Sequence, residues 1–591
     1  MSFVNLNPVG FQNVNITDKF WSSRIETIRN VTAWTCINQC ESTHRIDNFR
    51  RAAGWQPGGH EGIYFDDSDV YKVLEGAAYV LMGGADKKLE AKVDEIIDAI
   101  CAAQQEDGYL YTFYILNTPE LRWTDMNRHE AYCLGHMVEG ALAYVQATGK
   151  DKWLKAAVRA VEQMMRVNGP EGQHWVTGHQ EIEMALIKLY RYTGEKKYLE
   201  YVQWLVEERG HGHLRSESYK GIFGRTDYCQ DDLPVRELQR VTGHAVRAMY
   251  YYSAVTDLAA ILGEQSLDAA MQRLWANVVP ANLYLTGGIG QSAHNEGFTR
   301  DWSLPNLTAY CETCASIGMA FWNQRMNFTH GESRYADLVE REIYNGILSG
   351  ISLSGDLFFY DNPLATAGTY HRRSWFGCSC CPTNVIRFIP SVGGYVFATS
   401  GEDIYLNQFI QSESVVPTAA GDVGISMRTA YPWEETVEIT ITRCEGSRTL
   451  RVRKPGWCTH ARLMQNGAAV EKLSSGYYVC TVREGDTLSY TMEMPVVRVH
   501  ADERVEEDRE RVAVMRGPVV YCAEQVDNPG YAPEYFHAFK NLSKDTELTA
   551  AFEPELLGGV VTISGEGIKL VPYYAWDNRE PGAMAVWLLE N

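Results

Sequence analysis

The sequence predicts a mainly α protein with a β-rich C-terminal part: an (α/α)6 barrel, or toroid, of paired helices, followed by one or two antiparallel β-sandwiches. Three observations support this class. Apolar residues recur at helical spacing up to about residue 400, the helical stretches fall into pairs joined by short turns, and the pattern then changes to short β-branched and aromatic runs. Six antiparallel pairs would close into a double ring in which every second helix lines the centre.

Twelve stretches have helical periodicity and account for the six pairs. They are residues 20–40, 67–82, 87–104, 131–147, 151–166, 178–193, 196–208, 241–262, 265–278, 311–328, 333–348 and 381–398. The turns TGKDKW and TGEKKY are near-copies, and each places a glycine where one helix should end and the next should begin. Three Gly-His pairs, at His136, His179 and His244, are expected to open helices and so to converge at one mouth of the ring.

The chain beyond residue 400 has the pattern of strands. Runs such as IYLNQFI, VEITITR, TLSYTMEM and RVAVMRGPVVYCAE are separated by Gly, Asn, Asp and Ser clusters. We therefore expect a helical catalytic domain over residues 1–400, with residues 1–15 pairing with a sandwich. A β-sandwich should follow over 401–500, and a second sandwich, or the completion of the first, over 501–591. The charged run ADERVEEDRERV (501–512) either divides the sandwiches or is a solvated loop.

The composition indicates a globular protein with neutral partners. Hydrophobic residues make up 45% and charged residues 22%, which excludes a mainly disordered chain. The net charge of −21 opposes contact with nucleic acid or anionic lipid. No apolar stretch approaches the ~18 residues of a membrane span, and the N-terminal segment lacks the basic start and apolar run of a signal peptide. We expect a cytoplasmic protein without nucleic-acid or membrane partners.

Two groups of cysteines carry the strongest chemical signal. Cys311 and Cys314 lie in YCETC, and Cys378, Cys380 and Cys381 lie in CSCCPTN, each at the expected start of a helix. Clustered thiols in an intracellular protein indicate metal binding or catalysis, and zinc is the natural metal for such ligands. The cysteines then form a closed structural zinc site, a set of buried apolar residues or a reactive centre. The last fits because helix N-termini and metals lower the pKa of a thiol.

A glycine-rich loop, TGGIGQSAHNE, precedes the first cysteine group and presents Glu296. Glu296 is a candidate general acid, although a loop glutamate is more often a solvated charge. His136, His179 and His244 are either capping and packing residues or hydrogen-bond partners of a polyol. The aromatic content of 12% suits sugar stacking and core packing equally. Weaker candidates are His129, Glu130, Trp175, Tyr228 and Tyr360.

Taken together, these groups resemble glycoside hydrolase family 127, whose characterised members include β-L-arabinofuranosidases. The resemblance rests on FDDSDVYK, the Gly-His pairs, NEGFT, YCETCAS, CSCCPTN and MRGPVVYCAE, in this order along most of the chain. The family fold, an (α/α)6 barrel followed by β-sandwich domains, agrees with the fold predicted above. The resemblance implies an exo-acting enzyme that releases terminal β-L-arabinofuranose from plant-derived oligosaccharides, and a homodimer.

The resemblance also implies individual residue roles. Cys380 matches a zinc-bound cysteine nucleophile, and Glu296 matches the acid/base glutamate of a retaining double displacement. The implied Zn²⁺ ligands are Glu312, Cys314, Cys380 and Cys381, and the implied sugar-binding residues are His136, His179, His244 and Tyr360. Spacing by itself favours a different ligand pair, because Cys311 and Cys314 share a face of a regular helix whereas Glu312 and Cys314 do not.

Three alternatives stay open. The enzyme could hydrolyse another rare furanoside, such as a branched acidic pectic sugar, which a basic residue in the pocket would favour. It could instead be a toroid hydrolase or lyase that acts by carboxylates and has only a structural zinc, in which case Cys380→Ser would damage stability rather than chemistry. A non-catalytic carbohydrate-binding protein would keep its ligand affinity in Glu296→Gln and have no turnover to lose.

Overall fold

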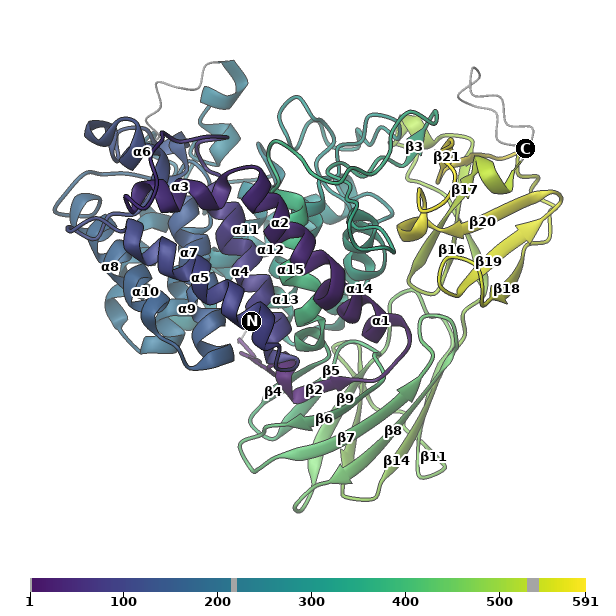
Figure 1. Cartoon of the computed structure of the whole chain (residues 1–591). Coiled ribbons are helices and arrows are strands. Elements are labelled where there is room, and N and C mark those ends of the chain that lie inside the picture. The colour runs from purple at the N-terminus through teal and green to yellow at the C-terminus, as the bar shows by residue number, and fades with distance from the viewer. Residues whose placement is uncertain (1–2, 214–220, 529–540) are drawn as a thin grey trace.

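The computed structural model describes residues 3–213, 221–528 and 541–591, and it places a helical body beside β-sheets (Figure 1). The fold is therefore mixed, with helices in the first two thirds of the chain and a β-rich C-terminal region. Each of the twelve stretches predicted as helical contains a helix. Within the described residues, sequence periodicity missed two short helices, α3 (Arg45–Ala52) and α6 (Thr112–Leu116).

Six helices in the described part of the chain contact one another in a closed cycle. In order around the cycle they are α4 (Asp67–Met82), α7 (Glu130–Thr148), α9 (Ile182–Thr193), α11 (Ala245–Leu262), α13 (Thr313–His330) and α15 (Cys380–Phe388). These helices are buried on most sides. In α7, for example, every residue from Glu130 to Val145 is buried. A helix with no polar face has no side to turn to solvent, so these six form an inner layer.

Six further helices pack against this ring from outside. They are α2 (Ala33–Ser42), α5 (Lys87–Ala103), α8 (Lys152–Val167), α10 (Lys196–Glu208), α12 (Gln265–Ala281) and α14 (Ser333–Arg341). Their burial is one-sided. On α8, Trp153, Ala157 and Val161 are buried while Lys155 and Arg159 are exposed, which is the 3.6-residue period of an amphipathic helix. Among the described helices, none combines the length and hydropathy needed to cross a bilayer.

Two sheets follow the helices and share a buried core with them. The first contains, in order, β1 (Asn7–Pro8), β4 (Phe397–Ser400), β5 (Asp403–Leu406), β9 (Arg448–Arg453), β13 (Tyr477–Val482) and β12 (Leu473–Ser474). The second contains β11 (Ala468–Ala469), β10 (Ala461–Gln465), β14 (Thr487–Met492), β8 (Thr436–Arg443), β7 (Val423–Thr429), β6 (Ser412–Val416) and β2 (Val14–Ile16). The N-terminal strands thus extend both sheets, because β1 pairs with β4 and β2 pairs with β6.

The third sheet decides between the two interpretations of the charged run 501–512. Its main path is β15 (Val496–Val499), β16 (Arg511–Arg516), β17 (Val519–Glu524), β20 (Ile568–Pro572), β19 (Val560–Gly565) and β18 (Thr549–Glu553). The run connects β15 to β16, which are antiparallel neighbours, and most of its residues are exposed. It is therefore a solvated loop within one sheet and does not separate two sheets.

The third sheet also supports two segments of the helical part. The short strand β3 (Ala365–Thr366) pairs with β21 (Met584–Ala585), and the Tyr573 hydroxyl donates to the carbonyl oxygen of Asn362 at 3.0 Å. Cys311 and Phe359 belong to the same buried cluster as the apolar side chains of this sheet. The residues next to these two in the chain, Glu312 and Tyr360, are thereby held in position from the C-terminal side.

Candidate active site

A pocket of about 230 Å³ opens over the N-terminal ends of the inner helices. It is lined by Phe65, His129, Tyr132, His179, Phe223, Tyr228, His244, Val246, Arg247, Tyr250, Glu296, Glu312, Cys314, Tyr360, Cys378 and Cys380. Tyr132, Tyr250, Cys314 and Cys380 each lie in the N-terminal half of an inner helix. The positive ends of several helix dipoles therefore meet here, which favours anionic side chains. We call this cavity the first pocket.

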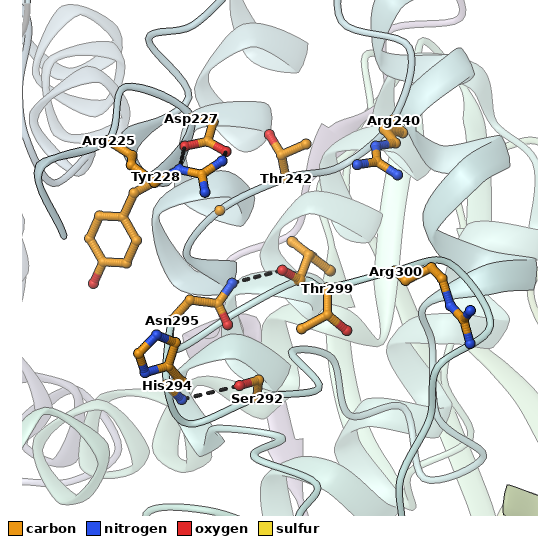
Figure 2. Close-up of a pocket in the computed structure, with 12 residues that line it drawn as sticks. Arg225, Asp227, Tyr228, Arg240, Thr242, Ser292, His294, Asn295, Thr299 and Arg300 are labelled. Carbon is orange, nitrogen blue, oxygen red and sulfur yellow. Dashed lines mark hydrogen bonds and ion pairs between the residues drawn. The ribbon is translucent and has the colours of Figure 1, made fainter. Parts of the chain in front are cut away.

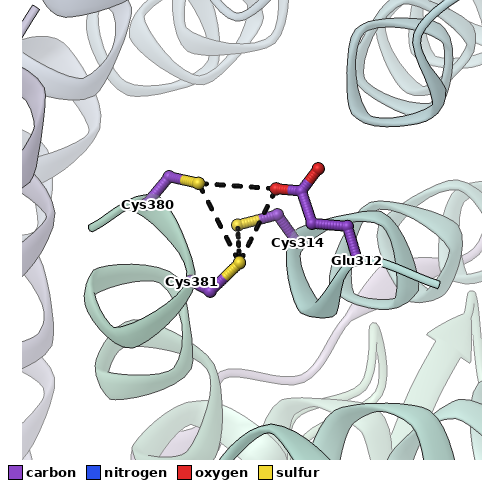
Figure 3. Close-up of side chains that lie close together, drawn as sticks. All are labelled: Glu312, Cys314, Cys380 and Cys381. Carbon is purple, nitrogen blue, oxygen red and sulfur yellow. Dashed lines mark hydrogen bonds between the residues drawn. The ribbon is translucent and has the colours of Figure 1, made fainter. Parts of the chain in front are cut away.

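Four side chains form a donor cluster at the first pocket, and three of them line it (Figure 3). Cys314 Sγ lies 3.5 Å from Cys381 Sγ, and Cys380 Sγ lies 3.9 Å from Cys381 Sγ. The Glu312 Oε1 atom is 3.4 Å from Cys380 Sγ and 3.6 Å from Cys381 Sγ. All four donor atoms lie within 4.8 Å of one another, so the cluster can hold a metal ion. Burial raises the pKa of Cys314, but hydrogen bonds from Cys380 and Cys381 lower it to about 6.

The backbone before α13 explains why Glu312, rather than Cys311, joins the cluster. The helix begins at Thr313, Glu312 is extended (φ −56°, ψ 135°), and Cys311 has a left-handed φ of 40°. Cys311 Sγ instead packs closely against Gly288. A Cβ atom added to this glycine would lie only 2.8 Å from the sulfur. The expectation from regular helical spacing is therefore wrong, because Cys311 precedes the helix. The Glu312–Cys314 pair is the one that the structure brings to Cys380 and Cys381.

The FDDSDVYK motif supports the second cysteine group rather than capping its own helix. Asp66 is at the N-cap position of α4 but makes no side-chain capping bond. Arg45 lies 3.2 Å from Asp66 and 3.1 Å from Asp69, and its guanidinium donates to the Gly377 carbonyl at 2.7 Å. Burial raises the pKa of Asp66 to about 8. This buried network fixes the turn that leads into Cys378 and Cys380.

Glu296 lies in the first pocket, on a loop and in a left-handed conformation (φ 49°). Its Oε2 accepts a hydrogen bond from the Tyr228 hydroxyl at 2.7 Å and lies 3.4 Å from His244 Nε2. His244 Nδ1 accepts from the backbone N–H groups of Val246 and Arg247, so the proton of the neutral ring belongs on Nε2, facing Glu296. Burial raises the pKa of Glu296, but these donors, together with the charge of Arg247, lower it to about 2.

The three Gly-His pairs end up in different places, which corrects the prediction that all open helices. His244 is the N-cap of α11, whereas His179 precedes α9 by three residues and His136 lies in the second turn of α7. His179 and His244 line the first pocket, but His136 does not. It is completely buried beneath Tyr132 (ring centroids 4.5 Å apart), with Nδ1 3.2 Å from Glu181. A contact between His136 and a ligand in the pocket therefore does not fit this structure.

Tyr360 lies beside the cluster, with its hydroxyl 3.1 Å from Cys380 Sγ. Of the weaker candidates, His129 and Tyr228 line the first pocket, while Glu130 and Trp175 do not. The sequence analysis missed Tyr132, Arg247 and Tyr250, because tyrosines and arginines inside helices have no distinctive spacing. It also missed Lys72, within FDDSDVYK, whose buried ammonium donates to the Tyr132 hydroxyl at 3.2 Å. Burial lowers the pKa of Lys72, but Asp69 and the nearby thiols raise it more.

Comparisons with known proteins cover the whole chain. The family profile described as "Beta-L-arabinofuranosidase, GH127 catalytic domain" matches residues 13–394, the GH127 middle domain matches 403–496 and the GH127 C-terminal domain matches 496–589. A non-reducing end β-L-arabinofuranosidase of Bifidobacterium longum subsp. longum is 37% identical over 97% of this chain and 99% of its own.

Solved structures agree. A GH127 β-arabinofuranosidase is 38% identical with a TM-score of 0.93, covering 99% of this chain and 98% of its own. A GH127 β-L-arabinofuranosidase from Geobacillus stearothermophilus T6 is also 38% identical, with a TM-score of 0.92, covering 98% of this chain and 100% of its own. The three consecutive family profiles and these full-length similarities lead to one conclusion: the chain belongs to glycoside hydrolase family 127 and is a glycoside hydrolase.

Proposed function

We propose that this protein is a retaining, exo-acting β-L-arabinofuranosidase in which Cys380 is the nucleophile and Glu296 is the acid/base. The observation that carries the proposal is that Cys380, at the start of α15, and Glu296, on a loop 84 residues earlier, line one small pocket. The full-length relatives named as β-L-arabinofuranosidases support the choice of sugar. A volume of 230 Å³ is below the ~300–1,000 Å³ of drug-sized ligand pockets, so it suits one terminal sugar ring.

The donor cluster fits zinc. A tetrahedral zinc with Zn–S of ~2.3 Å and Zn–O of ~2.0–2.2 Å would hold sulfurs about 3.8 Å apart and sulfur and oxygen about 3.5 Å apart. The sulfur–sulfur distances of 3.5 and 3.9 Å, and the sulfur–oxygen distances of 3.4 and 3.6 Å, agree with this geometry. Glu312 Oε2 is also buried with no hydrogen-bond partner among the described residues. Bound by Glu312, Cys314, Cys380 and Cys381, the ion would supply positive charge that keeps the thiols deprotonated.

In the first step the Cys380 thiolate attacks the anomeric carbon, and the bond to the leaving oxygen breaks as that oxygen takes a proton from Glu296. A glycosyl thioether on Cys380 is the result. The Tyr360 hydroxyl, 3.1 Å from Cys380 Sγ, orients the sulfur. His179 and His244 line the same space and offer ring nitrogens to the sugar hydroxyls.

In the second step Glu296 accepts a proton from water, and this water attacks the anomeric carbon and releases the Cys380 thiolate. Two inversions give net retention. The donors from Tyr228 and His244 hold Glu296 as the carboxylate that this step needs. For the first step, Glu296 must hold a proton, so we infer that the bound leaving group weakens these hydrogen bonds and raises its pKa.

Two alternatives fit less well. Arg247 is the basic residue of the first pocket, but its guanidinium donates to the Gly178 carbonyl at 2.5 Å and lies over the Tyr228 ring, so it is engaged by the protein rather than presented to an acidic sugar. A closed structural zinc site is disfavoured because three members of the donor cluster, Glu312, Cys314 and Cys380, line the pocket.

The proposal also covers the fold of the helical part, the domain division, the location and the oligomeric state. We assign the inner and outer helices to an (α/α)6 barrel, which the closed cycle of six contacts supports. We divide the chain into this barrel over 1–400 and two β domains that meet near residue 496, in line with the family profiles. A cytoplasmic location fits the fourteen cysteines, all described and all unpaired. We also propose that the protein forms a homodimer and that its substrate is a plant-derived oligosaccharide.

The test uses p-nitrophenyl β-L-arabinofuranoside with the wild type, Cys380→Ser and the matched control Cys378→Ser, together with the zinc content of all three proteins. We expect turnover to fall about a thousandfold or more in Cys380→Ser and to persist in Cys378→Ser, because Cys378 lies outside the donor cluster. The first product seen by NMR should be the β-anomer. Full activity of a folded Cys380→Ser variant would refute the mechanism.

A further inference from the structure

A second pocket of about 410 Å³, drawn in Figure 2, shares Tyr228 with the first. It is lined by Arg225, Asp227, Tyr228, Arg240, Thr242, Gly243, Ser292, His294, Asn295, Phe298, Thr299 and Arg300. Tyr228 lines both pockets, and Asn295 precedes Glu296 in the chain. The two pockets therefore lie next to each other at Tyr228 and at the Asn295–Glu296 segment. The volume of the second pocket lies within the ~300–1,000 Å³ usual for small-molecule sites.

The second pocket is positively charged in a protein whose net charge is −21. Arg225 donates to both Asp227 carboxylate oxygens, at 2.9 and 2.5 Å, so these two charges offset each other. Arg240 and Arg300 are exposed, and in the described part of the chain their guanidinium groups make no hydrogen bond or ion pair. In the view of Figure 2 both lie on the side of the pocket away from Tyr228. Two unpaired guanidinium groups at the edge of one cavity favour an anionic ligand, since arginine binds carboxylates in a bidentate manner.

Two buried polar atoms in the second pocket also lack partners. Asn295 is 9% exposed, and its Nδ2 donates to the Phe298 carbonyl at 2.7 Å, which leaves Oδ1 without a hydrogen bond among the described residues. Thr242 Oγ1 is likewise buried and unpartnered there. Buried polar atoms without a partner are unfavourable and are usually satisfied by a ligand or water. Both atoms are shielded from solvent in this structure, so a sugar hydroxyl would supply the missing hydrogen bonds after a local shift of the surrounding loops.

We propose that the second pocket is a leaving-group subsite for a uronic acid, in which Arg240 and Arg300 bind the carboxylate while Thr242 and Asn295 bind hydroxyls. The inference rests on the proposed function, because the group that Glu296 protonates departs on this side. The terminal arabinofuranose would occupy the first pocket and the acidic sugar the second. The charge of the leaving-group sugar, and not that of the terminal arabinofuranose, would then determine which substrates the enzyme prefers.

Binding of free sugars tests the subsite without requiring turnover. D-Galacturonate and its neutral counterpart D-galactose are titrated calorimetrically into the wild type, Arg240→Gln/Arg300→Gln and the control Arg462→Gln, which removes an exposed arginine from the second sheet. We expect galacturonate to bind the wild type about 3- to 10-fold more tightly at low salt, a range typical of two exposed ion pairs. The preference should vanish in the double variant, persist in the control and weaken in 0.5 M NaCl. Equal affinities in the wild type, or an unchanged preference in the double variant, would overturn the inference. Tight binding of inorganic phosphate with no galacturonate preference would also overturn it.

Kinetics separate this inference from the proposed function. With β-L-arabinofuranosyl galacturonate and β-L-arabinofuranosyl galactose of the same linkage, the acidic substrate should have a 3- to 10-fold lower KM in the wild type, and this difference should be lost in the double variant. Turnover of p-nitrophenyl β-L-arabinofuranoside without any preference for the acidic substrate overturns the subsite alone. Galacturonate binding that depends on Arg240 and Arg300, without hydrolysis of any arabinofuranoside, supports the subsite and refutes the proposed function.

Discussion

Tyr228→Phe should shift the ionisation of Glu296 in a defined direction. The Tyr228 hydroxyl donates to Glu296 Oε2 at 2.7 Å, and a hydrogen bond to a charged group is worth ~1.5–3 kcal/mol. The Glu296 side chain is 33% exposed, so we take the lower end, about 1.5 kcal/mol, which corresponds to about one pKa unit. A donor stabilises the carboxylate, so its loss raises the pKa of Glu296 from about 2 toward about 3.

The assay is the pH dependence of kcat, which reports ionisations of the enzyme–substrate complex, in which we infer that the leaving group raises the pKa of Glu296. Because the first step needs protonated Glu296, the alkaline limb should move about one pH unit higher in Tyr228→Phe. Tyr132→Phe is the matched control, since it removes a hydroxyl from the same pocket that contacts Lys72 instead. An alkaline limb that stays in place, or moves to lower pH, would refute the role of Tyr228.

Three further predictions concern the cluster and the buried charges. Cys381→Ser removes a fully buried donor and should lower both the bound zinc and the Tm. Cys311→Ala changes a residue outside the donor cluster and should keep its zinc. Equal zinc contents in the two variants would contradict the ligand assignment. Arg45→Met leaves buried Asp66 without its cation and Asp69 with Lys72 alone, at 3.8 Å. It should cost about 3 kcal/mol in urea unfolding, against ~0.5 kcal/mol or less for exposed Arg462→Met. Burial raises the pKa of Glu130 from 4.5 to about 8, so the folded protein holds a proton that the unfolded chain releases between these pH values. The free energy of unfolding should therefore decline from pH 5 to pH 8. Glu130→Gln should flatten this decline, and an unchanged slope in the variant would contradict the prediction.

The cysteine motifs show where reasoning from sequence succeeded and where it stopped. Helix starts near Cys314 and Cys380 were predicted from local pattern and are confirmed, because periodicity and capping are properties of a few adjacent residues. The choice between Cys311 and Glu312 was not available from spacing, since it depends on a left-handed backbone at Cys311 that the third sheet and Gly288 impose. The resemblance to a family named the carboxylate that the structure places beside the cysteines, whereas helical geometry did not.

The histidines of the three Gly-His pairs also show what the sequence predicts and what it does not. His136, His179 and His244 have identical Gly-His contexts, yet one is buried behind Tyr132 and two line the pocket. Their positions relative to the helix start decide this, and a difference of a few residues along a helix turns a side chain to another face. Sequence periodicity does not locate a helix start to within that margin.

The sequence by itself determined the alternation of inner and outer helices, the strand-rich C-terminal part and the presence of clustered thiols, because each is recorded in the spacing of neighbouring residues. Only the tertiary structure decided that Glu312 meets Cys380, 68 residues later in the chain, and that Arg240 and Arg300 line one cavity. Such contacts depend on how helix ends and loops from distant segments of the chain pack against one another. The spacing of neighbouring residues does not determine this packing.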